Sequence, residues 1–292
     1  MNNRKLYRLV AVAAAMITPT TVLALDKKPT NEAILAEVAM GYSRISMPAR
    51  LDSVVTVPSY TYSAQSSHGS SYLAGSYSTT LAEEGVVQGD AAGSLKNTDM
   101  EVMLGYRSSS NMNWYAGYKK GETAVDYIGR DDAAARIGSE SFNKSGYFAG
   151  LGYSMNMGAL GVLTLSVEYN KLDTDNRFIS LAATCEGDAC TDTDGDTTAG
   201  DTTTEDTTTE DTVTDTAVES TTGNFSDLVG DYEGKADGLN YGVSWQIPLA
   251  KSLAFNTTFK IRNYDETIES EGVVYSASQK QSIFNVGVLW AF

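Results

Sequence analysis

The chain has 292 residues and a formal net charge of −16, from 21 Lys and Arg against 37 Asp and Glu, with a single His. This acidic balance excludes the basic surface that nucleic-acid binding needs. The acidity is local, because 15 acidic residues and no basic one lie between Phe178 and Gly234, and outside that stretch 22 acidic residues face 21 basic ones. With 17 Tyr, 26 Gly and only 5 Pro, the remainder favours strands.

Residues 1–24, MNNRKLYRLVAVAAAMITPTTVLA, have the pattern of a secretory signal peptide. A basic start precedes an apolar stretch, and Val22 and Ala24 fit a small-residue cleavage site. The alternative, an uncleaved anchor, would need roughly 20 apolar residues, and this stretch is shorter. We therefore expect export and a mature chain of residues 25–292.

The stretch AEVAMGYSRI, at 36–45, alternates strictly and predicts a first strand. Ala36, Val38, Met40 and Tyr42 share its apolar face. From Thr98 onward the same period of two recurs, with an apolar stripe opposite a polar or glycine face each time. Seven further strands are predicted at about 98–108, 112–121, 146–154, 161–170, 238–247, 253–262 and 283–292.

The connections between these strands alternate between short and long. Tight turns are expected at Ser108–Asn111, Asn156–Leu160 and Pro248–Ser252, and long loops at about 122–144, 173–237 and 265–279. The loop at 173–237 is acidic and is expected to be disordered. A soluble sandwich would also alternate, but regular short and long connections are typical of an up-and-down barrel in a membrane. There the apolar face meets lipid and closure pairs every backbone group. We predict an all-β, antiparallel transmembrane barrel.

The number of strands depends on residues 47–97. A bacterial barrel has an even number of strands, so the eight predicted strands suffice if 47–97 is a long outer loop. The segments 51–63 and 70–82 also have strand composition, and together they would make ten strands. Pro58 and weak apolar faces favour eight strands, with ten as the alternative.

The last residues carry a family resemblance. Asn285-x-Gly287-x-x-Trp290-x-Phe292, together with the repeated MGYS, LGYR, AGYK and LGYS strand cores, resembles small Gram-negative outer-membrane barrels of the OmpA/OmpX/Ail type. The resemblance implies that the barrel-assembly machinery recognises the terminal strand. It also implies an outer-membrane location, in contact with lipopolysaccharide.

Six charged residues are predicted on the inward faces of the strands: Glu101, Arg107, Lys119, Glu168, Lys260 and Arg262. They could line a conducting pore or fill the interior as ion pairs. Since a barrel of eight strands is just wide enough for its own side chains, we favour a filled lumen. Ten strands would favour a narrow channel.

The remaining candidates are weak. His68 lies in a Ser- and Gly-rich stretch without the orienting acid that a nucleophile needs, so we predict no enzyme activity and no cofactor. Asp192, Asp194 and Asp196 resemble part of a calcium loop but lack its full pattern, which leaves weak divalent-cation binding as a hypothesis. Cys185 and Cys190 are expected to form a disulfide after export.

The favoured function is a monomeric structural or surface-interaction barrel whose outer loops carry any specific binding. A small diffusion channel is the alternative.

Overall fold

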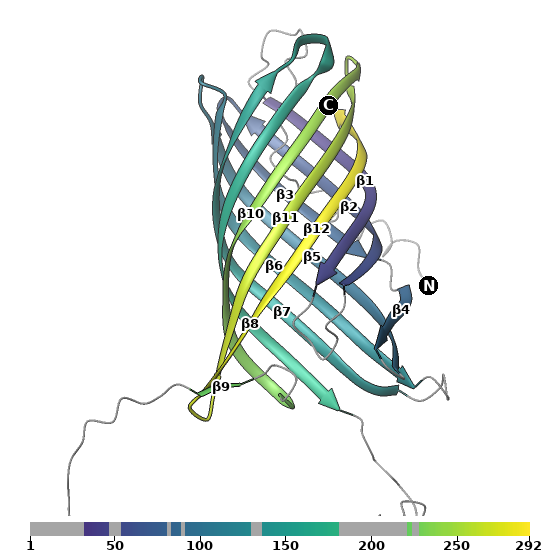
Figure 1. Cartoon of the computed structure of the whole chain (residues 1–292). Coiled ribbons are helices and arrows are strands. Elements are labelled where there is room, and N and C mark those ends of the chain that lie inside the picture. Colours follow the sequence, from purple (N-terminus) through teal and green to yellow (C-terminus); the bar gives the residue numbers. More distant parts are fainter. Residues whose placement is uncertain are drawn as a thin grey trace, which may run out of the picture.

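A computed structural model describes residues 32–46, 54–80, 83–88, 91–129, 136–180, 221–223 and 228–292. They form a closed antiparallel barrel of ten strands (Figure 1). The barrel strands are β1 (Glu32–Ser46), β2 (Val54–His68), β3 (Ser71–Thr80), β5 (Ala91–Arg107), β6 (Met112–Gly129), β7 (Arg136–Asn156), β8 (Val162–Ser180), β10 (Gly230–Ala250), β11 (Leu253–Ser270) and β12 (Val273–Ala291). Each pairs with its neighbours in this order, and β12 pairs with β1 to close the ring.

Three short elements complete the described fold. β4 (Glu83–Gln88) pairs with β5, and β9 (Thr221–Gly223) runs parallel to the start of β12. A single 3-10 turn, η1 (Gly158–Leu160), links β7 to β8. None of the helices among these residues has the length and apolar character to cross a membrane. The predicted signal peptide, 1–24, lies outside the described residues.

The up-and-down barrel is confirmed, but the preference for eight strands is wrong. β2, β3, β4 and the start of β5 occupy the stretch 47–97 that was predicted as a loop. Pro58 misled the prediction because proline cannot donate to a central ladder. In the structure Pro58 pairs with Tyr42 of β1 and lies one residue beyond the last described β2–β3 pair, Ser59 with Thr80.

The described parts of the long loops predicted at 122–144, 173–237 and 265–279 are largely strand, and most of 173–237 (181–220 and 224–227) lies outside the described residues. β6 runs to Gly129, β8 to Ser180 and β11 to Ser270, where Glu271 and Gly272 make a tight turn into β12. These extensions were missed because their outward residues are polar, as Glu122, Asp173 and Asp265 illustrate. In these extensions the outward face is polar and the inward face is apolar, the reverse of the membrane-spanning part. This is the pattern of strands that are surrounded by water.

Apolar side chains cover the outside of the other half of the barrel. Met40, Leu104 and Tyr147 are 62%, 67% and 74% exposed, whereas the inward Glu101 is only 2% exposed. Tyrosines and tryptophans lie near both ends of this band, with Tyr118 and Tyr147 at one end and Trp114 and Trp290 at the other. An apolar outer band between aromatic belts is the surface of a membrane-spanning barrel.

The two ends of the barrel differ. Four short connections, β2–β3, β5–β6, β7–β8 and β10–β11, lie together at one end, the top in Figure 1, where the backbone N–H of Phe292 donates to the carbonyl of Ile34 at 2.9 Å. We call this the turn end. At the opposite, outer end, strands β6 to β12 project beyond β1 and β2. The short β11–β12 turn also lies at the outer end.

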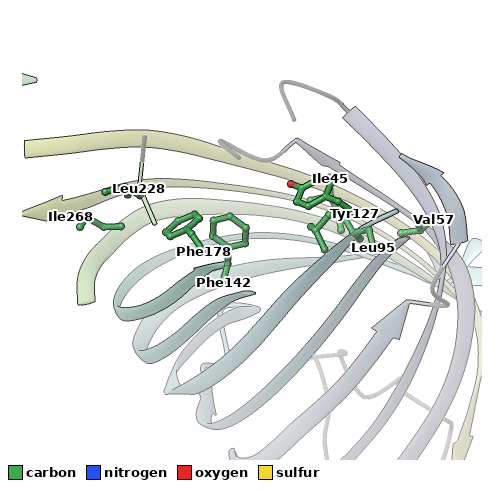
Figure 2. Close-up of a cluster of buried hydrophobic side chains, with 9 residues drawn as sticks. Ile45, Val57, Leu95, Tyr127, Phe142, Phe178, Leu228 and Ile268 are labelled. Atoms are coloured by element: carbon green, nitrogen blue, oxygen red, sulfur yellow. The ribbon is translucent and has the colours of Figure 1, made fainter. Parts of the chain in front are cut away.

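The outer end has an apolar core of its own. Its members come from the inward faces of seven strands and from the segment before β10: Ile45, Val57, Leu95, Val125, Tyr127, Phe142, Phe178, Leu228 and Ile268. Phe142 and Phe178 meet edge to face at a centroid distance of 5.5 Å, and Figure 2 shows them beside Leu228 and Ile268. The outer end is therefore a packed extension of the barrel.

Candidate functional site: the charged lumen

An ion-pair network crosses the lumen from β5 to β11. These two strands are five steps apart in either direction around the ring, so they face each other across the barrel. Arg262 Nη2 lies 2.8 Å from Glu101 Oε1, and Arg262 Nη1 lies 2.7 Å from Asp99 Oδ2. Lys260 Nζ lies 3.2 Å from the same Glu101 oxygen. The network therefore spans the full width of the interior.

Two further residues extend the network to β6 and β8. Lys119 Nζ lies 2.6 Å from Glu168 Oε1 and 3.3 Å from Glu101 Oε1. Glu168 also accepts a hydrogen bond from the Asn240 amide at 2.7 Å. Three carboxylates thus face three cations, and this balance is what allows so many charges to be buried together.

Cross-strand pairing places these side chains. Glu101 is directly opposite Lys119 in the β5–β6 register. Glu168 is opposite Gly150, and Lys260 is opposite Gly242. The space above these glycines is taken by Tyr115 over Gly150 and by Ser166 over Gly242.

The structure brings together five of the six charges predicted to face inward. Arg107 is the exception, since its guanidinium lies 4.8 Å above the Tyr72 ring near the turn end. Asp99 belongs to the network but was not among the predicted site residues, although the alternation of the strand places it on the same face as Glu101. A second buried pair, Lys144 Nζ to Glu266 Oε2 at 3.3 Å, was missed because both residues fell in predicted loops.

An aromatic layer lies between the network and the turn end. Tyr72, Met103, Tyr115 and Phe148 form one buried cluster, in which the Tyr115 and Phe148 rings are 6.3 Å apart. Lys119 Nζ lies 4.9 Å from the centre of the Phe148 ring, which joins the layer to the network.

Two small cavities flank the network at this level. One of about 40 Å³ lies beside Tyr115 and Glu168, and another of about 30 Å³ lies beside Phe142 and Arg262. Each has room for about one to a few waters. The charges, the aromatic layer and the apolar outer core all lie within the lumen.

Glu37 is an inward carboxylate that neutral side chains contact. Ser63 donates to it at 3.0 Å and Asn256 at 2.6 Å, within the part of the chain that the structure describes. We expect Glu37→Gln to leave the free energy of unfolding unchanged or to raise it by about 1 kcal/mol, because a lone buried charge is costly and the Ser63 hydroxyl can accept as well as donate. Urea unfolding of the variant in lipid vesicles tests this, and a loss of more than about 1 kcal/mol would contradict it.

The seam between β12 and β1 is bridged on the lumen side. Asn285 of β12 reaches past Gly41 of β1 to contact Ser59 at 3.2 Å and Thr61 at 3.0 Å, both on β2. From the other direction, Glu37 of β1 reaches Asn256 of β11, the strand on the far side of β12. These contacts tie each closing strand to the strand beyond its partner.

Other predicted site residues lie elsewhere. Gly287 faces the lumen opposite Ala39, while Trp290 lies on the lipid-facing side. His68 ends β2 on the exposed outer face at the turn end. Asp192, Asp194 and Asp196, and the predicted disulfide of Cys185 and Cys190, lie outside the described residues.

No protein-family model matches the chain, and no curated protein matches it in sequence. Among solved structures, the chain is similar to the outer membrane protease OmpT from Escherichia coli, with 8% identity, a TM-score of 0.47, and coverage of 92% of this chain and 100% of that one. It is also similar to Neisserial surface protein A (8%, TM-score 0.33, 91% and 100%) and to the Pseudomonas putida toluene transporter TodX (8%, TM-score 0.30, 96% and 95%). The likeness is one of barrel architecture alone.

The closed ring, the apolar outer band and the aromatic belts define a small outer-membrane β-barrel. In such barrels the short turns face the periplasm and the longer connections lie outside the cell. On this general pattern, we infer that the turn end is the periplasmic end.

Proposed function

We propose that this protein is a closed, non-conducting outer-membrane scaffold that acts through the part projecting from the membrane. The observation that carries the proposal is the Arg262–Glu101 contact of 2.8 Å between opposite strands. A solute would have to separate that pair and the neighbouring Lys119–Glu168 pair in order to pass. Breaking buried ion pairs costs several kcal/mol each, so spontaneous opening is rare.

The surface beyond the membrane supports a role in contacts outside the cell. β6 to β12 extend well past the aromatic belt, while about ten residues suffice for a strand to cross. Their outward residues are charged, as at Asp173, Glu233 and Lys235, and a packed apolar core holds them rigid. A rigid, charged platform presents the outer connections to partners.

Conductance in a planar bilayer tests this proposal. We expect the refolded protein to give no stable openings, with insertion established independently by heat-dependent migration on gels. Discrete openings in the wild type would overturn the scaffold and favour the alternative, a small diffusion channel. In that case Lys119 and Arg262 would line the pathway, and their neutral variants would change its ion selectivity.

The same proposal includes export, assembly and partners. Residues 1–24 direct export, and the terminal strand with Trp290 and Phe292 engages the barrel-assembly machinery. Lipopolysaccharide surrounds the apolar band in the outer leaflet, and divalent cations associate weakly with the acidic segment. The absence of enzyme activity is supported by the position of His68, on the outer face at the turn end rather than beside the lumen charges.

A further inference from the structure

A groove of about 720 Å³ crosses the lipid-facing side of the barrel from β2 to β7. Its floor is one cross-strand row, in which each residue is paired directly with the next: Ser66, Leu73, Leu104, Ala116 and Ala149. A second row, closer to the turn end, forms one wall: His68, Ser71, Tyr106 and Trp114. The groove is shallow and open toward the lipid along its length.

The groove exists because two small side chains lie between large ones. Ala116 and Ala149 are neighbours on β6 and β7. Trp114 stands on one side of them, and on the other side Tyr118 and Tyr147 meet edge to face at 5.5 Å. Alanine between aromatic residues leaves a trench about one side chain deep.

The floor of the groove is held rigid from the lumen. The Tyr72 ring packs over Gly105, where an added Cβ would lie 2.0 Å from the ring, and Tyr115 packs over Gly150 in the same way at 2.5 Å. Aromatic side chains that cover glycines in a neighbouring strand stabilise curved sheets. The groove is therefore formed before any ligand arrives, which lowers the cost of binding.

The row climbs from the membrane boundary toward the middle of the bilayer. Ser66 and Leu73 lie close to the β2–β3 turn at Gly69, Leu104 and Ala116 lie farther from the Ser108–Asn111 turn, and Ala149 lies farthest from its own turn. The row crosses four interstrand spacings of about 4.8 Å, which gives a length of roughly 19 Å. Because the strands are tilted by ~40°, the two ends of the row differ in height along the membrane normal by about 12 Å. That height is close to one leaflet of a hydrocarbon core about 30 Å thick.

The chemistry of the groove changes along the same direction. Its periplasmic end is polar, with Ser66, His68 and Ser71, and its inner end is apolar, with Ala116 and Ala149. We propose that it binds one acyl chain of a glycerophospholipid from the periplasmic leaflet, with the headgroup at the His68–Ser71 turn. The groove is continuous with the lipid-facing band, and its polarity matches that of a lipid lying headgroup-first toward the periplasm.

Native mass spectrometry of the refolded barrel with palmitoyl-oleoyl phosphatidylglycerol tests the proposal. We expect one lipid to be retained on the wild type, and Ala149→Leu to weaken its binding by about ten-fold, the effect of excluding roughly two methylene groups of the chain. The matched control is Ala36→Leu, which adds the same bulk on the lipid-facing side of β1 and should bind like the wild type.

A second measurement does not depend on that variant. With Trp245 and Trp290 replaced by Phe, Trp114 in the groove wall is the remaining tryptophan of the 3 in the chain. A phospholipid brominated in mid-chain should quench it at mole fractions too low for random contact. Equal retention in both leucine variants, or quenching that follows only the bulk lipid fraction, would overturn the proposal. A dimer lost in Ala149→Leu would assign the groove to a second copy of the barrel instead.

Discussion

Glu101→Gln is expected to lower the free energy of unfolding by about 3–5 kcal/mol, the usual cost of removing one partner from a buried ion pair. Glu101 is 2% exposed and lies within 3.3 Å of three cations, Lys119, Lys260 and Arg262. Without its charge, Asp99 and Glu168 are left to balance all three. Urea unfolding in lipid vesicles, followed by tryptophan fluorescence, measures the loss.

The control for this variant removes a carboxylate that stands in water. Asp237 lies on the exposed outer face of β10. We expect Asp237→Asn to change the free energy of unfolding by less than about 0.5 kcal/mol. In the double variant Glu101→Gln, Arg262→Gln the lumen charges balance again, and we expect about 1–3 kcal/mol of the loss to return. If Glu101→Gln unfolded with the same free energy as Asp237→Asn, the ion-pair network would not be what holds the lumen closed.

The inward position of these charges could be predicted from the sequence, but their meeting could not. The period of two placed Glu101, Lys260 and Arg262 on the polar faces of their strands. Which strands face each other depends on the size of the ring. With eight strands, β5 and β11 would be five steps apart one way and three the other. β2 and β3 make the two separations equal, and the network spans the diameter only in that larger ring.

The outer extension was hidden for a related reason. Alternation continues through Val125 and Tyr127 of β6 and through Phe178 of β8, but there the apolar residues point inward. The charged outward residues of these outer segments favour a loop in the sequence, although the period of two continues through them. A strand that leaves the membrane exchanges lipid for water on its outer face, so the inner face becomes the one that must be apolar. The change of phase near Tyr118 and Tyr147 marks that boundary.

Gly41→Ala is expected to prevent stable closure of the barrel. A Cβ at Gly41 would lie 1.8 Å from the carbonyl oxygen of Phe284 and 2.5 Å from Asn285 Oδ1, so the backbone of the seam would have to move. Overpacking of this kind costs about 1–3 kcal/mol or more. It would also displace Asn285 from Ser59 and Thr61, which removes the contacts that tie β12 to β2.

The matched control is Gly152→Ala, another inward glycine of a barrel strand, where an added Cβ would lie 3.3 Å from its nearest neighbour, the Leu165 carbonyl oxygen. Both variants are refolded into vesicles without any assembly machinery, so that recognition of the terminal strand plays no part. We expect Gly152→Ala to reach the compact, heat-modifiable form and Gly41→Ala to fail or to unfold at much lower urea. Equal yields and midpoints would mean that the seam accommodates the methyl group. Since no turn joins β1 to β12, the space at Gly41 decides whether the first strand can pair with the last.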